Sequence, residues 1–259
     1  MNEKELLRKF PKGKFYPIVV TEVTRMSKGN YCVAAWDVHA RAMVRPLQAS
    51  GANWRLGPNR SVFSPGSILN CVPTGARRSG YPHATEDLLL ASPPALLHKL
   101  DEPHLHALIA PYAFSSVVEL FGAELIDHKF IEDGTRCRSL GGLRVPSAKA
   151  RFLEDDFGRL RLDFSDSTNA TYRLAVTCDW LQHIFSPSDD DAEPHFGVSE
   201  ANEWIDANPK GSELILRIGL ARGWAGKEGQ WHPLRCYAQL NGIICPEDNW
   251  HIFAGPPAT

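Results

Sequence analysis

The sequence predicts a mainly β fold with minor α, arranged as small β-barrels. Short runs of apolar and β-branched residues are separated by turns that carry Gly or Pro, which favours small barrels over a parallel sheet. This plan occurs both before and after a central stretch with helical periodicity. The 259 residues are enough for one large domain or two small ones. We therefore predict two small barrels in tandem, over residues 1–125 and 126–259.

The first half begins with a predicted meander of strands. Gly29 and Asn30 follow the first strand and can adopt the positive φ that a tight turn requires. A second turn, Ser-Pro-Gly at residues 64–66, precedes a later strand. The predicted strands are residues 16–24, 31–37, 42–47, 67–72 and 86–90.

A predicted helical segment follows the first barrel. Ser92 is a suitable N-cap, and the two prolines after it suit a first helical turn. Leucines recur near helical spacing as far as Leu108, and Pro103 is expected to divide the segment in two. A further short helix is expected over residues 115–121. This segment is predicted to link the two barrels.

The second half repeats the strand-rich plan with helical insertions. Residues 160–164 alternate charged and apolar side chains, as a half-buried strand does. Asp179 is expected to cap a helix through residue 185, and Ser199 a helix that ends before Pro209. The predicted strands are residues 142–145, 150–153, 160–164, 172–177, 213–218 and 235–240.

Composition excludes several classes of protein. Apolar residues make up 43% of the chain and charged residues 22%, as in globular proteins. No stretch approaches the roughly 18 apolar residues of a membrane helix. The first ten residues, MNEKELLRKF, carry charges where a secretion signal has an apolar run. We expect a cytoplasmic protein with no membrane contact.

The cysteines and histidines do not form a metal-binding pattern. The six cysteines are scattered and never form a C-x-x-C pair, so we expect buried thiols. His104 and His106 are two residues apart, which does not place both rings on one helical face. The sequence predicts no metal site.

Charge is distributed unevenly along the chain. Residues 1–80 contain thirteen Lys or Arg and four acidic residues, whereas residues 81–259 contain fifteen and twenty-six. This asymmetry favours a polyanionic partner for the basic part and a possible protein partner for the acidic second half. Two other interpretations stay open: the parts attract each other, or the charges form a solvated surface.

Several short motifs resemble the dual OB-containing domain family. In the first half they are TEVTR at residues 21–25, YCVAA at 31–35, VRPL at 44–47 and PHATED at 82–87. In the second half they are LRIGLAR at residues 216–222 and CYAQLNGI at 236–243. The resemblance covers nearly the whole chain. It implies two OB-type barrels in tandem, a prokaryotic origin and a nucleic-acid role in biological-conflict or antiphage systems.

An OB-type groove binds single strands with cations that follow the phosphates and aromatic rings that stack on bases. Thr24 lies at a strand end beside a turn, where barrel loops meet ligands. Trp36 stands inside an apolar strand and is expected in the core. The candidate cations are Arg25, Lys28, Arg45, Arg55, Arg60, Arg77 and Arg78, and the candidate aromatics are Tyr31, Trp54, Phe63 and Tyr81.

Arg45 interrupts an otherwise apolar strand, where a charge is costly without a partner. It can grip a phosphate or carboxylate of a ligand with both guanidinium nitrogens. Equally, it can form an internal ion pair with Glu86 or Asp87. Arg222 is the comparable candidate in the second half.

Motifs of the common enzyme and cofactor-binding families are absent from the sequence. We find no phosphate loop, dinucleotide fingerprint, nucleophile elbow, H-E-x-x-H or deaminase signature, and we expect no cofactor. His83 and Glu86 are a candidate acid–base pair. Cys137, between two arginines, is a candidate nucleophile with a lowered pKa.

We predict a non-enzymatic protein that binds nucleic acid, single strands in preference to duplex. A nucleotide- or nucleic-acid-modifying enzyme with its site between the barrels is the first alternative. A protein-interaction module of a larger complex is the second.

Overall fold

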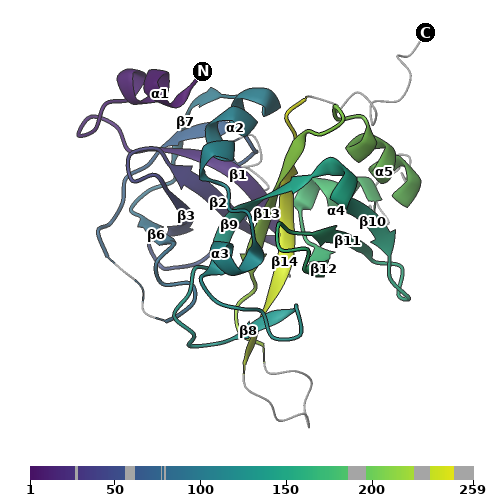
Figure 1. The fold of residues 1–259 in the computed structure, drawn as a ribbon. Helices are drawn as coiled ribbons and strands as arrows, with labels where there is room; N and C mark the ends of the chain where they lie inside the picture. The colour runs from purple at the N-terminus through teal and green to yellow at the C-terminus, as the bar shows by residue number, and fades with distance from the viewer. Residues whose placement is uncertain are drawn as a thin grey trace.

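Two mixed β-sheets, one from each half of the chain, form most of the structure (Figure 1). The structure, a computed structural model, describes residues 1–26, 29–55, 62–76, 78, 80–185, 197–224 and 234–247, with the backbone alone for 183–185. The prediction of a mainly β fold with minor α is confirmed. Two strands of the second half, β13 (Glu213–Leu220) and β14 (Arg235–Ile244), run through the middle of the molecule beside the first sheet (Figure 1).

The first sheet has the strand order β6-β3-β2-β1-β5-β7, with β4 paired to β2. Neighbours are antiparallel except β3 and β6, which are parallel. The chain after β5 returns to β6 through a bridge between Pro73 and Leu90, so the sheet curls on itself. Its strands are β1 (Pro17–Arg25), β2 (Asn30–Asp37), β3 (Ala42–Gln48), β4 (Trp54–Arg55), β5 (Ser67–Asn70), β6 (Asp87–Leu90) and β7 (Ala95–Lys99).

The prediction of a helix directly after Ser92 is wrong for the first part of that segment. Ala95–Lys99 is strand β7, which pairs with β5, and the helix α2 (Glu102–Ile109) begins only after it. Asp101 caps α2, and Pro103 lies in its first turn instead of dividing a helix. Most side chains of β7 are exposed, so the sequence lacks the alternation that marks a half-buried strand. Hydrogen bonding to β5 decides its conformation.

The described residues of the first half form three further short helices. The helix α1 (Glu3–Lys9), which the sequence analysis did not predict, is capped by the Asn2 side chain, and Glu5 completes the capping box. A 3-10 turn, η3 (Ala110–Tyr112), follows α2, and α3 (Val117–Phe121) is capped by Ser116. The short helix predicted over residues 115–121 is therefore confirmed.

The second sheet has the order β10-β11-β12-β14-β13-β9, with β8 paired to β14. One 3-10 turn, η4 (Ser147–Lys149), joins β9 directly to β10, so the two ends of this path are consecutive in the chain. Strands β12 and β14 are parallel. The strands are β8 (Phe130–Glu132), β9 (Leu140–Pro146), β10 (Ala150–Glu154), β11 (Leu160–Ser165), β12 (Thr171–Val176), β13 (Glu213–Leu220) and β14 (Arg235–Ile244).

Two helices connect β12 to β13 as predicted. They are α4 (Asp179–Phe185) and α5 (Val198–Asp206). Gly197, not Ser199, is the N-cap of α5, and the Glu200 carboxylate accepts a hydrogen bond from the Gly197 backbone N–H at 2.8 Å. Trp204 of α5 is fully buried and anchors this helix in the core of the second half.

The two halves share an apolar cluster. Val19 and Trp36 of the first sheet pack in one cluster with Ile215 and Ile244 of the second. An isolated bridge between Thr24 and Cys178 also joins β1 to the chain before α4. The six cysteines are free thiols, five of them buried, as predicted. Among the described residues, none of the helices has the length and apolar character required to cross a membrane.

Candidate functional site

A cavity of about 330 Å³, lined by several arginines among both polar and apolar residues, lies where the two halves meet. Its walls come from the end of β1, from β2 and the middle of β3, the segment before β6, the start of β9, the end of β13 and the residues after it, and β14. We call it the arginine cavity. Its lining residues include Thr24, Arg25, Cys32, Arg45, Asn53, His83, Thr177, Ala221, Arg222, Gln239 and Asn241. The structure thus gathers four residues predicted to bind nucleic acid, and one predicted catalytic residue, around a single cavity.

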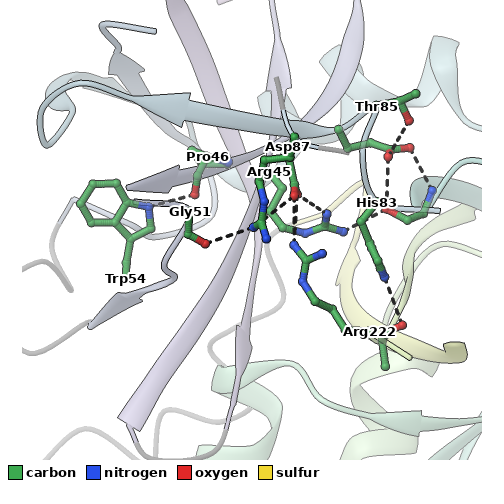
Figure 2. A network of polar contacts seen from close by, with 12 residues as sticks. Arg45, Pro46, Gly51, Trp54, His83, Thr85, Asp87 and Arg222 are labelled. Atoms are coloured by element: carbon green, nitrogen blue, oxygen red, sulfur yellow. Dashed lines mark hydrogen bonds and ion pairs between the residues drawn. The ribbon is translucent and has the colours of Figure 1, made fainter. Parts of the chain in front are cut away.

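Three arginines surround the buried carboxylate of Asp87 beside this cavity (Figure 2). Arg45 lies 2.7 Å from it, Arg222 3.0 Å and Arg78 3.5 Å. Burial favours the uncharged acid, but attraction to Arg45 and Arg222 is stronger in sum and lowers the pKa of Asp87. Asp87 is therefore ionised at neutral pH. The single negative charge of Asp87 is thus surrounded by three positively charged guanidinium groups.

Arg45 forms the internal ion pair that the sequence left as one of two options. Its side chain is only 4% exposed, and its second terminal nitrogen donates to the Ser139 hydroxyl at 3.0 Å. Burial alone would lower the pKa of Arg45, but Cys32 and Asp87 raise it, so the guanidinium stays charged. Because Arg45 lines the cavity, it still contributes positive potential there.

Arg25 and Arg222 are the more accessible cations of the cavity. Arg25 ends β1 and pairs with Asp179 at 3.1 Å, with 30% of its side chain exposed. Arg222 follows β13, and 45% of its side chain is exposed. Arg45 also lines the cavity, and Arg78 lies beside it on Asp87, so among the described residues four arginines are paired with two carboxylates, Asp87 and Asp179. The balance is positive, which favours an anionic ligand.

His83 lines the arginine cavity as a neutral side chain. Burial and the charges of Arg45 and Arg222 lower its pKa to about 3. Its Nε2–H donates to the Ala221 carbonyl at 3.2 Å, which joins the segment before β6 to the end of β13 (Figure 2). The buried His83 Nδ1 and Thr24 Oγ1 have no hydrogen-bond partner among the described residues.

The predicted acid–base pair of His83 and Glu86 is not formed. Glu86 instead accepts hydrogen bonds from the Ser139 backbone at 2.9 Å and from the Thr85 hydroxyl at 2.8 Å. It lines a different cavity, of about 350 Å³, together with Trp36. The chain turns between the two residues, so their side chains face separate spaces.

The lowered pKa predicted for Cys137 is wrong. The thiol is buried, and its pKa is raised to about 11. Burial is the largest cause, the nearby Glu86 carboxylate adds to it, and only Arg138 opposes it. The Arg138 guanidinium donates to the backbone carbonyls of Leu120 and Glu119 and lies 4.6 Å from the Phe114 ring centre. Cys137 is a protonated core thiol at neutral pH.

The aromatic candidates of the first half are largely core residues. Trp54 is buried, donates its indole N–H to the Pro46 carbonyl at 2.9 Å, and packs against Phe63 at 5.2 Å between ring centres (Figure 2). Neither ring is available to stack on a base, because neighbouring core side chains cover both. Tyr31, opposite Trp54 on β2, is half-buried. Trp36 is a core residue, as predicted.

The remaining candidate residues for nucleic-acid binding do not line the arginine cavity or lie outside the described residues. Arg55 is exposed at the end of β4, and Arg78 donates to the Gly51 carbonyl at 3.1 Å in addition to contacting Asp87. Lys28, Arg60 and Arg77 lie outside the described residues. Tyr81 lies 5.9 Å from the Arg136 guanidinium. The described part of the chain contains no cluster of three or more His, Cys, Asp or Glu arranged to hold a metal ion.

Sequence reasoning missed two kinds of residue at this site. Asp179 was expected only as a helix cap, yet it neutralises Arg25 from 154 positions away in the chain. Gln239 and Asn241, which also line the cavity, lie in the CYAQLNGI motif but were not named as site residues. The motif does not indicate which of its side chains face the cavity.

No protein-family model matches the chain, and no curated protein matches it. The resemblance to the dual OB-containing domain family stays a prediction.

Proposed function

We propose that this protein binds single-stranded nucleic acid, with the phosphates held at the arginine cavity. One observation carries the proposal: Arg25, Arg45 and Arg222, from both halves of the chain, line one cavity. With Arg78, which contacts Asp87 beside it, four guanidinium groups of the described residues are paired with two carboxylates. Guanidinium groups bind phosphate with two parallel hydrogen bonds and keep their charge at any physiological pH. An excess of them around one cavity favours a polyanionic ligand.

The strand connections support a proposal of two OB-type barrels. In the first half, β1, β2 and β3 form a meander, β6 runs parallel to β3, and β5 pairs with β1. In the second half, β10, β11 and β12 form the meander, and β14 runs parallel to β12. Strand β13 pairs with β9, which η4 joins directly to β10. OB barrels bind oligonucleotides on one sheet face and its adjoining loops.

Within this proposal, the arginines have different roles. Arg45 is buried and neutralises Asp87, so it is a positioning residue. Arg222 and Arg25 are partly exposed and are expected to contact phosphate. Because Arg45 already balances the Asp87 charge, the positive charge of Arg222 remains available to a ligand.

The salt dependence of binding tests this proposal. Association of the full chain with a labelled single-stranded oligonucleotide is measured by fluorescence anisotropy over a salt series. We expect affinity to fall steeply as salt rises, because phosphate contacts release counterions. Arg222→Gln should weaken binding and reduce the slope of log K against log salt by about 0.7, the value for one phosphate contact on a single strand.

Arg151→Gln is the matched control. Arg151 is an exposed arginine, paired with Asp206 at 2.8 Å, and it does not line the arginine cavity. It should change neither the affinity nor the slope. Absence of oligonucleotide binding at low salt, or equal effects of the two substitutions, contradicts the proposal.

The geometry gives no support to the alternative of a modifying enzyme. A protonated, buried Cys137 is a poor nucleophile, and the neutral His83 has its Nε2–H engaged with a backbone carbonyl. We therefore do not propose an enzymatic activity for the described residues.

A further inference from the structure

A groove of about 590 Å³ crosses the second sheet on β11, β12 and β14. We call it the Trp224 groove. Its walls include Lys129, Arg161, Arg173, Trp224, Tyr237 and Gln239. Sequence analysis sought the aromatic part of the binding surface in the basic first half. This groove lies in the acidic second half.

Two aromatic rings of the groove are held in place by neighbours. The Trp224 ring centre lies 6.3 Å from that of Tyr237, which lies 5.4 Å from that of Phe130. Two backbone hydrogen bonds of 3.1 Å between Trp224 and Arg235 fix the chain there. Half of the Trp224 side chain is nevertheless exposed. A large apolar ring that is fixed in position and half exposed is suited to binding a flat partner.

The groove also carries an excess of cations. Asp155 accepts two hydrogen bonds from Arg161, at 2.9 and 2.6 Å, and Asp163 accepts two from Arg173, both at 2.7 Å. These ion pairs hold the guanidinium groups along β11 and β12. Lys129, Arg161 and Arg173 line the groove with one lining carboxylate, Asp155, while Asp163 and Asp156 lie close to Arg173. Rings and cations together favour a ligand that is both flat and anionic.

The Trp224 groove adjoins the arginine cavity. Ala221 and Gln239 line both spaces. Arg222, the exposed cation of the cavity, is two residues before Trp224 in the chain. A ligand that fills the cavity with its phosphates can therefore continue over Trp224 without leaving the surface.

We infer that the Trp224 groove is the base-stacking surface of the nucleic-acid site, and that Trp224 and Tyr237 stack on unpaired bases of a strand whose phosphates reach Arg222. This inference rests on the proposed function. It requires a single strand, because in a duplex the bases stack on one another and cannot reach a side chain. It places the stacking surface in the acidic second half, where the sequence analysis named Arg222 as a candidate cation but no aromatic candidate.

Two probes of equal length separate stacking from phosphate binding. One is a labelled single-stranded oligonucleotide, and the other is the same phosphodiester backbone with abasic sites. We expect wild-type protein to bind the oligonucleotide more tightly. Trp224→Ala should lower oligonucleotide affinity about tenfold to a hundredfold, the range for one lost stacking partner, and leave the abasic strand unaffected. Trp224→Phe should restore most of the loss.

Leu96→Ala is the matched control, because Leu96 is an exposed apolar side chain on β7 outside both spaces. Thermal unfolding establishes that each variant is folded. If wild-type protein binds both probes equally, or Trp224→Ala weakens both equally, the stacking inference is overturned while the proposed function stands. If wild-type protein binds neither probe at low salt, both are overturned.

Discussion

Asp87 and His83 show how burial and neighbouring charge act on single residues at the candidate site. Both side chains are buried near the same arginines. Positive charge stabilises the anionic form of Asp87 and destabilises the cationic form of His83, so both pKa values fall. As a result, the site holds an ionised carboxylate and a neutral imidazole at neutral pH.

The lowered pKa of His83 predicts a loss of stability in mild acid. The unfolded chain binds a proton at this histidine below its ordinary pKa of 6.5, whereas the folded protein does so only near 3. The free energy of unfolding should therefore fall as pH drops from 6.5 towards 3, by at most about 1.4 kcal/mol for each pH unit. Urea unfolding at pH 7, 6, 5 and 4 measures it.

His83→Gln removes the titrating group and offers an amide N–H to the Ala221 carbonyl. Its free energy of unfolding should depend less steeply on pH over the same range. The Asp87 carboxylate contributes little to the difference between wild type and variant, because its pKa in the folded protein is lowered from 3.8, below the range of the measurements. Parallel pH profiles for wild type and variant would refute the neutral, buried state of His83.

At the scale of elements, the turn before β5 determines how the first sheet closes. Gly66 has φ of +84°, its N–H donates to the Val20 carbonyl, and its carbonyl accepts from the Leu100 N–H, both at 2.9 Å. A Cβ at this position would lie far inside contact distance of the Leu100 carbonyl oxygen. The turn thus joins β1 to the end of β7, and only glycine fits.

Gly66→Ala should destabilise the protein by several kcal/mol, because it combines a positive φ with a clash against backbone. Gly13→Ala is the matched control: its φ is +88°, but no atom lies within 4 Å of the added Cβ. It should cost about 1 kcal/mol. Urea midpoints of the two variants provide the measurement. Equal losses would show that the clash at Gly66 is relieved by a small movement.

At the scale of the whole molecule, a fully buried ion pair joins the halves. Arg217 on β13 donates to Glu22 on β1 at 2.9 Å, and both side chains are 1% exposed. Burial of two charges is costly, so the pair is not itself a source of great stability. Removal of one partner, however, leaves the other charge buried without compensation.

Glu22→Gln should therefore lower the free energy of unfolding by about 3–5 kcal/mol. The double variant Glu22→Gln with Arg217→Met removes both charges and should recover a large part of this loss. Urea denaturation of the two single variants and the double variant measures the coupling. If the effects of the single variants simply add, the two side chains do not interact in solution.

Much of the fold could be predicted because strand signals are local. Alternation of apolar and polar residues, with β-branched runs between turns, located β1, β2, β3, β11 and β14 to within a few residues of their observed bounds. The exposed edge strand β7 carries no such alternation, and its pairing with β5 is a long-range contact. The sequence therefore predicted a helix there.

The candidate site could be predicted only in part. Thr24, Arg25, Arg45 and Arg222 were named from the sequence, and the structure places them around one cavity. Trp54 was named for stacking, yet its indole N–H is bonded within the core. Periodicity separates the faces of a long strand, but β4 has only two residues and gives no such signal.

The sequence by itself determined the β-rich class, the positions of most strands, the buried cysteines and the core position of Trp36. Each depends on the side chain and its near neighbours, through hydrophobic burial and the two-residue repeat of a strand. The tertiary structure alone decided which carboxylate each arginine meets, which aromatic rings stay open to solvent, and that Ala221 and Gln239 line both the arginine cavity and the Trp224 groove. These depend on how two halves pack, since partners such as Arg25 and Asp179 are 154 positions apart.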